Sequence, residues 1–235
     1  MRKYSPTALA LAAALALPGI ASAQDTPLPI SANVAFTTDY VFRGISQTNE
    51  RFAVQGGFDW AGESTGIYIG TWASNVDFDS ETSVELDGYV GWAHSWGDFG
   101  VDIGYLHYNY PGESGLNTDE VYAKGIWKWI TLAYYYTISD TAFGIADARG
   151  SGYFNAALEY TLPMGLTLGG AYGTTMYSGG PAGAPNDAGD YDDYKIYAGL
   201  SYTGLDFQLA WTDTDIDNPV ATQKDRFVFT VSKSF

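Results

Sequence analysis

The segment RFVFTVSKSF (226–235) decides the fold, because it reads as an amphipathic β-strand that ends on an aromatic residue. Its apolar positions share one parity and are Phe227, Phe229, Val231 and Phe235. Its polar positions share the other parity and are Arg226, Thr230, Ser232 and Ser234, with Val228 as the exception. A period of two residues is typical of a strand with one apolar and one polar face. Domains commonly end in short polar tails, so we expect this strand to be the last piece of a closed structure.

The same alternation recurs along the chain. It is found in 33–43, 51–61, 83–93, 99–108, 153–162, 193–202 and 205–212. Short turns near 61–64, 95–98, 128–131, 162–165 and 203–204 alternate with longer, acidic loops. This pattern predicts about twelve antiparallel strands, with both chain ends and the short turns on the same side.

The first 23 residues, MRKYSPTALALAAALALPGIASA, have the order of features found in a secretory leader. Arg2 and Lys3 precede an apolar run that is too short to span a membrane, and the stretch ends on Ala21-Ser22-Ala23. A basic start, an apolar run and an A-x-A exit indicate a cleaved signal peptide. We therefore predict a signal peptide over 1–23 and a single exported domain over 24–235.

Composition narrows the possible functions. The formal net charge is −16, and removing Arg2 and Lys3 with the leader makes it −18. Such a charge argues against nucleic acid as a partner and against electrostatic attraction to anionic lipid. The chain has no cysteine, so an exported domain needs a large core or a closed hydrogen-bond ladder. Beyond the leader no apolar run approaches the roughly 20 residues of a spanning helix, so a membrane-embedded chain would cross as a β-barrel.

Two architectures share the alternation: a soluble barrel or sandwich with its apolar face inward, and an outer-membrane barrel with its apolar face outward. Charged residues are frequent on the polar parity, and the connections divide into a short and a long side. Aromatic residues on the apolar parity lie near predicted strand ends, as interfacial girdles require. They are Phe42, Trp60, Trp92, Trp127, Trp129, Tyr160, Tyr202 and Trp211. The sequence therefore favours an all-β fold, a transmembrane antiparallel up-and-down β-barrel in the outer membrane.

Two stretches carry a family resemblance. TDYVFRGISQ (38–47) and GIYIGTWASNVDF (66–78) resemble recurring motifs of the TorF-like porins of Gram-negative bacteria. The resemblance covers essentially the whole mature chain and implies an outer-membrane barrel and a diffusion channel, without naming a solute. The aromatic end at Phe235 is similar to the assembly signal of outer-membrane proteins, although Lys233 stands where an apolar residue is more usual.

Strand parity predicts which charged residues line the lumen. The acidic candidates are Asp39, Asp59, Glu85, Asp87, Asp102, Glu159 and Asp206, and the basic ones are Arg43, Lys195 and Arg226; Asp193, Lys124 and Lys128 share this parity. Arg43 is expected near the outer end of the first strand, facing Asp39, Glu85 and Asp87. Two interpretations stay open: a transverse field across a constriction, or arginines that satisfy buried carboxylates and plug the barrel.

Other candidate chemistry is limited to two histidines and an acidic loop. His94 or His107 could serve a barrel enzyme as a base, but nothing in the sequence places a third catalytic group beside either, so we expect interfacial histidines. The stretch DTDIDN (213–218) begins like a calcium loop, yet Asn218 replaces the required Gly and Lys224 stands in place of the last Glu. We expect no cofactor and no dedicated metal site.

These features predict a passive outer-membrane channel for small hydrophilic solutes. Cation preference is expected because luminal and loop acids outnumber the bases. The alternatives are a non-conducting structural or partner-binding barrel and a barrel enzyme acting on lipid. The expected partners are outer-membrane lipid, lipopolysaccharide, the outer-membrane assembly machinery and small hydrophilic solutes, with no nucleic acid.

Overall fold

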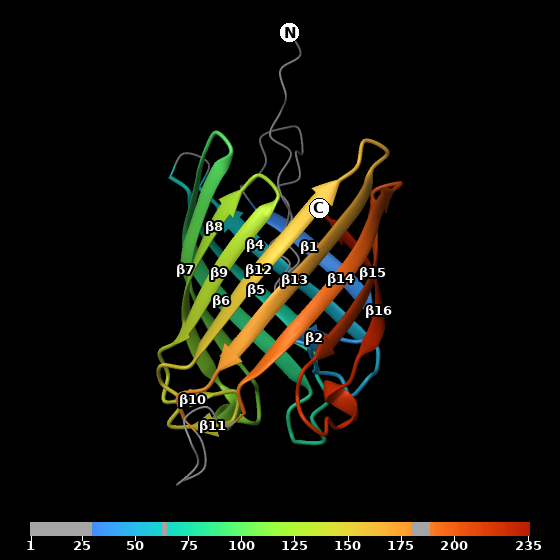
Figure 1. The fold of residues 1–235 in the computed structure, drawn as a ribbon. Coiled ribbons are helices and arrows are strands. Elements are labelled where there is room, and N and C mark those ends of the chain that lie inside the picture. The colour runs from blue at the N-terminus through green and yellow to red at the C-terminus, as the bar shows by residue number, and fades with distance from the viewer. Residues whose placement is uncertain (1–29, 63–64, 180–188) are drawn as a thin grey trace.

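The computed structural model describes residues 30–62, 65–179 and 189–235, and the predicted signal peptide 1–23 lies outside them. In the described part of the chain, twelve strands close into one antiparallel barrel (Figure 1). They are β1 (Ile30–Thr37), β4 (Ala53–Ala61), β5 (Ile67–Asn75), β6 (Val84–Trp96), β7 (Phe99–Asn109), β8 (Thr118–Trp127), β9 (Ile130–Thr137), β12 (Gly152–Thr161), β13 (Leu166–Met176), β14 (Tyr191–Tyr202), β15 (Leu205–Thr214) and β16 (Arg226–Ser234). The prediction of about twelve antiparallel strands is confirmed.

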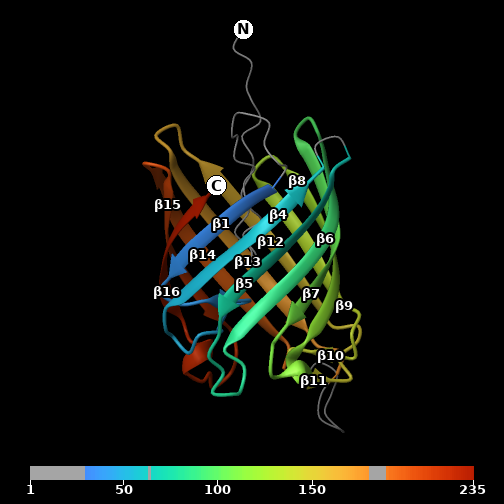
Figure 2. The same ribbon diagram turned by 180° about the vertical axis from the view of Figure 1, so that it is seen from behind.

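The barrel closes by pairing the last strand with the first. β1 lies between β16 and β4 (Figure 2), with Phe36 opposite Val231 on one side and opposite Val54 on the other. The backbones of Ala32 and Phe235 exchange two hydrogen bonds, of 2.8 and 3.2 Å between nitrogen and oxygen. Closure leaves no unpaired sheet edge, which is the hazard that open sheets must otherwise cover.

The two ends of the barrel differ. The C-terminal residue and the short turns lie at one end, and the long connections lie at the other (Figure 1). The long connections carry the remaining elements, which are β2 (Val41–Phe42), β3 (Ile45–Ser46), β10 (Thr141–Ala142), β11 (Ile145–Ala146) and the 3-10 turns η1 (Ser114–Leu116) and η2 (Ala221–Gln223). None of the helical turns in the described ranges is long and apolar enough to cross a membrane.

The side chains are arranged inside out relative to a soluble barrel. Phe58, Ile196 and Leu209 on the exterior are 62%, 61% and 51% exposed, whereas Glu85 and Asp102 are buried in the interior. An apolar exterior with a polar lumen is the pattern of a barrel that faces lipid. The alternative of a soluble barrel with an inward apolar face is therefore wrong.

Aromatic rings form a girdle on the exterior near the short turns. His94 stacks between Trp92 and Trp96, with ring centroids 5.7 and 5.6 Å apart. Trp129 contacts Trp127 and Tyr160 at 6.4 and 6.1 Å. Amphipathic rings at this level suit the boundary between lipid tails and headgroups.

Candidate functional site

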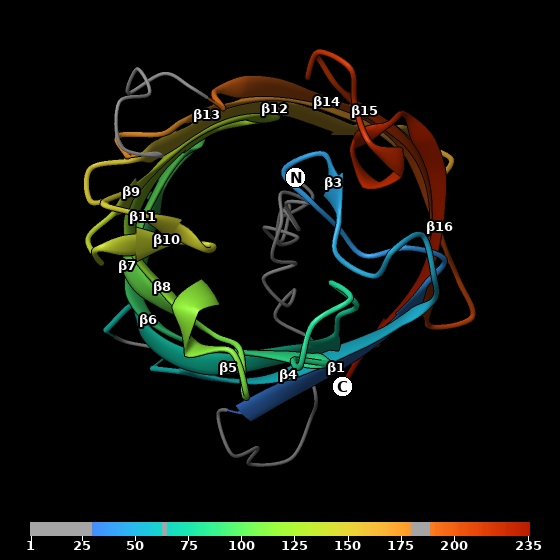
Figure 3. The same ribbon diagram turned by 90° about the horizontal axis from the view of Figure 1, so that it is seen from below.

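Residues 38–52, which we call the inward loop, leave the sheet after the first strand, and the hairpin at the centre of this loop turns into the lumen. β1 ends at Thr37, and β2 and β3 form a small hairpin, with β3 visible inside the ring of strands (Figure 3). Arg43 and Gly44 form the tip of this hairpin, with φ angles of 46° and 80°. Positive φ at both central residues is the geometry of a tight two-residue hairpin turn. A Cβ on Gly44 would lie 2.5 Å from Thr214 Cγ2, so the glycine also lets the tip approach β15.

The inward loop corrects two expectations from the sequence. The first strand does not continue to Arg43, and Phe42 does not face lipid. Phe42 is buried in the lumen against Tyr108, with ring centroids 5.7 Å apart, and Tyr40 is buried against Trp72 at 5.3 Å. The alternation continues through this stretch because a hairpin inside the lumen is also extended backbone with two faces.

Arg43 is held by a buried ion pair. Its Nη2 donates to Glu120 Oε1 and Oε2, at 2.9 and 2.7 Å. The guanidinium also lies 4.3 Å from the ring centroid of Tyr153. Burial alone would lower the pKa of Arg43, but the Glu120 carboxylate more than offsets this effect, so the pKa lies above its ordinary value. The expectation that Arg43 faces Asp39, Glu85 and Asp87 is corrected, because Glu120 is its ion-pair partner.

Asp39 anchors the base of the inward loop. Its Oδ1 accepts hydrogen bonds from Ser46 Oγ at 2.6 Å and Thr48 Oγ1 at 2.8 Å. Its Oδ2 accepts one from Arg226 Nη1 at 2.8 Å, so the last strand is tied to the loop. Both luminal arginines therefore satisfy buried carboxylates, as one part of the second interpretation expected; whether they plug the barrel is a separate question.

Tyrosines lie across glycines of the neighbouring strand and reach a carboxylate, and we call these units tyrosine straps. Tyr89 on β6 lies over Gly70 on β5 and donates to Asp59 on β4. A second strap spans β12 to β14. There, Tyr197 on β14 lies over Gly169 on β13 and donates to Glu159 on β12. Each strap places a tyrosine ring over a glycine of the wall and supplies a hydrogen bond to one oxygen of a carboxylate.

A third strap serves Asp102 on β7. Tyr68 on β5 lies over Gly91 on β6 and donates to Asp102. Lys124 Nζ lies 3.3 Å from the other oxygen of that carboxylate. Asp102 is thus partnered within the wall.

Substituting a strap glycine should cost more than substituting the glycine beside it. A Cβ on Gly169 would lie 2.2 Å from Tyr197 Cζ, so Gly169→Ala must displace the ring from Glu159. Overpacking of this kind costs roughly 1–3 kcal/mol. At Gly170, the nearest atom to a new Cβ is Lys195 O at 3.3 Å, so Gly170→Ala is the matched control. Urea unfolding of the refolded barrel checks the difference, and equal losses for the two variants would contradict the strap.

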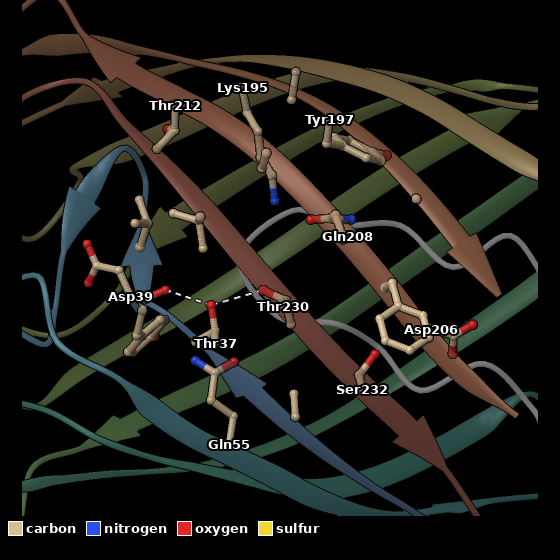
Figure 4. Close-up of a pocket in the computed structure, with 18 of the residues that line it drawn as sticks. Thr37, Asp39, Gln55, Lys195, Tyr197, Asp206, Gln208, Thr212, Thr230 and Ser232 are labelled. Carbon is tan, nitrogen blue, oxygen red and sulfur yellow. Dashed lines mark hydrogen bonds between the residues drawn. The ribbon is translucent and has the colours of Figure 1, made fainter. Parts of the chain in front are cut away.

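The lumen contains a cavity of about 450 Å³ on one side of the barrel axis. Most of its lining comes from β1 and β13–β16, and the inward loop bounds it at the long-loop end. Figure 4 shows neutral polar side chains on this wall, among them Gln208, Thr230 and Ser232. Thr230 Oγ1 donates to Thr37 Oγ1 at 2.9 Å, and Thr37 Oγ1 donates to the Asp39 carbonyl at 2.9 Å.

The structure separates the predicted luminal residues into two groups. Those lining the cavity are Asp39, Arg43, Glu159, Lys195 and Asp206, and those outside its lining are Asp59, Glu85, Asp87, Asp102 and Arg226. Glu85 and Asp87 are buried two residues apart on β6, and Glu85 Oε1 accepts a hydrogen bond from Tyr40 at 3.2 Å. Asp206 accepts one from Ser201. Lys128 lies in a short turn, 3.6 Å from Asp98, so its luminal assignment is wrong.

Sequence reasoning missed several members of this site. Glu120 has the same parity as Lys124, so the pattern contained the signal for its luminal position. The pattern of charge along the strands does not mark the neutral residues of the lining. They are Asn33, Gln55, Asn155, Thr167, Gln208, Thr212, Thr230, Ser232 and Ser234.

The histidines and the acidic loop make local contacts. His107 Nδ1 lies 2.8 Å from Asp119 Oδ1, and His94 belongs to the aromatic girdle. Asp213 Oδ1 accepts from the Thr214 amide at 2.8 Å, and Asp215 Oδ1 accepts from the Asp192 amide at 2.7 Å.

A closed barrel with an apolar exterior and a polar, partly filled lumen defines a porin-type outer-membrane barrel. The chain belongs to Gcw_chp, a family of bacterial proteins of unknown function, whose model matches residues 21–235. A search of curated proteins found no match. The porin-type fold that the TorF-like resemblance implies is therefore supported. The family that matches the sequence is Gcw_chp.

The solved structures that match this chain include porins. The KdgM porin superposes with a TM-score of 0.56 at 10% identity, covering 87% of this chain and 99% of that one. The KdgM porin in complex with disordered oligogalacturonate gives 0.54 at 10% identity, covering 88% and 98%. OprD of Pseudomonas aeruginosa gives 0.44 at 14% identity, covering 88% of this chain and 66% of that one. At these identities the likeness concerns the fold.

Proposed function

We propose that the protein is an outer-membrane channel for passive diffusion of small hydrophilic solutes. The observation that carries the proposal is the off-axis cavity of about 450 Å³, whose wall carries hydroxyl, amide and charged side chains among apolar ones. A polar lumen suits hydrated solutes, and an apolar exterior suits lipid. The porin-type fold supports the same conclusion.

The proposal includes the route by which the protein reaches its site. Residues 1–23 would direct export and be removed, and 24–235 would form the single barrel domain. Phe235, which is 59% exposed, would serve as the assembly signal read by the outer-membrane assembly machinery. The exterior would contact outer-membrane lipid, and the long loops would lie near lipopolysaccharide.

Cation preference follows from the charges that face the cavity. Its acids are Asp39, Glu159, Asp193 and Asp206, and its bases are Arg43 and Lys195. Asp39 and Arg43 are each neutralised by an ion pair, so the remaining groups leave an excess of negative charge. Negative walls raise the local concentration of cations, most strongly at low salt.

Planar-bilayer recording tests the proposal. We expect single-channel conductance and, across a KCl gradient, a reversal potential of the sign that marks K⁺ preference. The preference should fall in the double variant Glu159→Gln and Asp206→Asn, in which Tyr197 and Ser201 keep acceptors but the two charges are gone. It should also weaken as ionic strength rises. Anion preference in the wild type would defeat the charge argument.

A non-conducting structural barrel is the second candidate, and one observation favours it. The inward loop and the aromatic cluster around Phe42 and Tyr108 fill the half of the lumen formed by β4–β9. If this filling extended across the cavity in the membrane, the purified protein would insert and fold without conducting. Folded, inserted protein with no conductance would therefore establish the second candidate.

A further inference from the structure

Lys195 differs from the other bases that point into the lumen. Arg43, Lys124 and Arg226 each have a carboxylate oxygen nearby, at 2.7, 3.3 and 2.8 Å. Across the described ranges, no carboxylate lies within the 4.0 Å ion-pair distance of the Lys195 amine. Figure 4 shows this side chain directed into the cavity.

The wall around Lys195 is suited to hydroxyl groups. Thr212 lies directly opposite Lys195 on β15, and Gln208 and Thr230 line the same cavity. On the other side, Lys195 is opposite Ala171 on β13, a small residue that leaves space. A volume of about 450 Å³ falls within the roughly 300–1,000 Å³ of small-molecule sites.

The acids near Lys195 in the sheet are only partly engaged, because Asp193 Oδ2 is buried with no hydrogen-bond partner among the described residues. Asp193 Oδ1 accepts from Tyr153 at 3.3 Å, and Glu159 accepts from Tyr197 through a tyrosine strap. Lys195 Nζ lies 5.4 Å from the centroid of the Tyr197 ring. An ammonium group has three donors and no acceptor, and this ring contact does not satisfy those donors in a partly desolvated wall, which is unfavourable. A carboxylate entering the cavity would form charge-assisted hydrogen bonds there, which are stronger than neutral ones.

We propose that Lys195 binds the carboxylate of a small polyhydroxylated solute inside the lumen. Thr212, Gln208 and Thr230 take its hydroxyl groups. The inference deepens the proposed channel and rests on it for the solute's entry, while binding itself is measured without conduction.

The acids of the cavity lie at different distances from Lys195. Asp193 is two residues away on β14, and Glu159 accepts from Tyr197, which is two residues away in the other direction. Asp206 is opposite Ser201, which is six residues from Lys195 along β14, or roughly 20 Å at strand spacing. The screening length at physiological salt is about 8 Å. Asp206 can therefore favour cations at its end of the cavity, while the wall beside Lys195 carries Asp193 and Glu159 as well as the amine that would bind a carboxylate.

Two solutes that differ by one group test the inference: gluconate, a polyol with a carboxylate, and sorbitol, the neutral polyol. The refolded full chain is acetylated with N-acetoxysuccinimide, and modification of each lysine is followed by peptide mass spectrometry. At ten times its dissociation constant, gluconate should slow acetylation of Lys195 roughly tenfold, and sorbitol should not. Lys233, which is exposed, is the internal control and should be unaffected by either.

A conductance arm separates this inference from the proposed channel. Gluconate should block K⁺ current in the wild type and in Lys195→Arg, and about tenfold more weakly in Lys195→Gln. Protection of Lys195 without any current would refute the channel and leave the binding site standing. Current without protection or block, or equal effects of sorbitol and gluconate, would overturn the binding site.

Discussion

Replacing Leu209 by arginine is expected to remove most of the folded barrel from bilayers, whereas replacing its neighbour Gln208 by arginine is expected to be tolerated. Leu209 lies in the middle of β15, is 51% exposed and faces lipid, while Gln208 lines the cavity. Arginine on the lipid face near the bilayer midplane costs roughly 2–4 kcal/mol. Inside the lumen the same side chain meets water and an excess of acids.

The two variants introduce the same side chain at adjacent positions of one strand. They therefore differ mainly in whether the new arginine faces lipid or the lumen. Folded yield after refolding into lipid vesicles is measured by the heat-modifiable mobility of the folded barrel, and stability by urea unfolding. A loss at Gln208→Arg as large as that at Leu209→Arg would contradict the face assignment.

Arg43→Ala is expected to destabilise the barrel and to widen the lumen at the same time. Glu120 is 1% exposed, and removing its partner leaves an uncompensated buried charge, which costs roughly 3–5 kcal/mol. The tip of the inward loop also loses its anchor, so conductance and K⁺ preference should both rise. If the wild type does not conduct, current appearing only in this variant would identify the loop as the plug.

Two variants control for this result. Arg51 belongs to the same loop and pairs with Asp77 at 2.6 Å, but its side chain is 71% exposed, so Arg51→Ala should cost no more than about 1 kcal/mol. Adding Glu120→Gln to Arg43→Ala removes the buried charge and should recover stability while the conductance stays high. Equal effects of Arg43→Ala and Arg51→Ala on urea unfolding and conductance would contradict the anchoring role.

The barrel could be predicted because its determinants are local. In 193–202, alternation separates Ile196 and Leu200 from Lys195 and Tyr197, and the structure places them on opposite faces. The short turns were recognisable from Gly165, Gly204 and their neighbours, where positive φ is required. Each of these features is encoded within a few residues.

The lumen could be predicted only in part, because its contents depend on how distant strands align. Parity places Asp59 and Tyr89 inward, but their contact across Gly70 requires the register of three strands. Parity also has no means of detecting that the chain leaves the sheet after Thr37. Gly44 after Arg43 was the local sequence feature that indicates a hairpin turn. The regular alternation on either side favoured a continuous strand instead.

The junction between β1 and β16 pairs over five positions, against eleven between β6 and β7. Two side-chain contacts supplement its few backbone hydrogen bonds: Arg226 to Asp39, and Thr230 to Thr37. Asp39, Thr37 and Thr230 line the cavity. A solute seated against this wall stabilises the closed form by an amount that grows with its concentration over its dissociation constant. Occupancy of the lumen and resistance of the barrel to lateral opening into the bilayer are therefore thermodynamically linked.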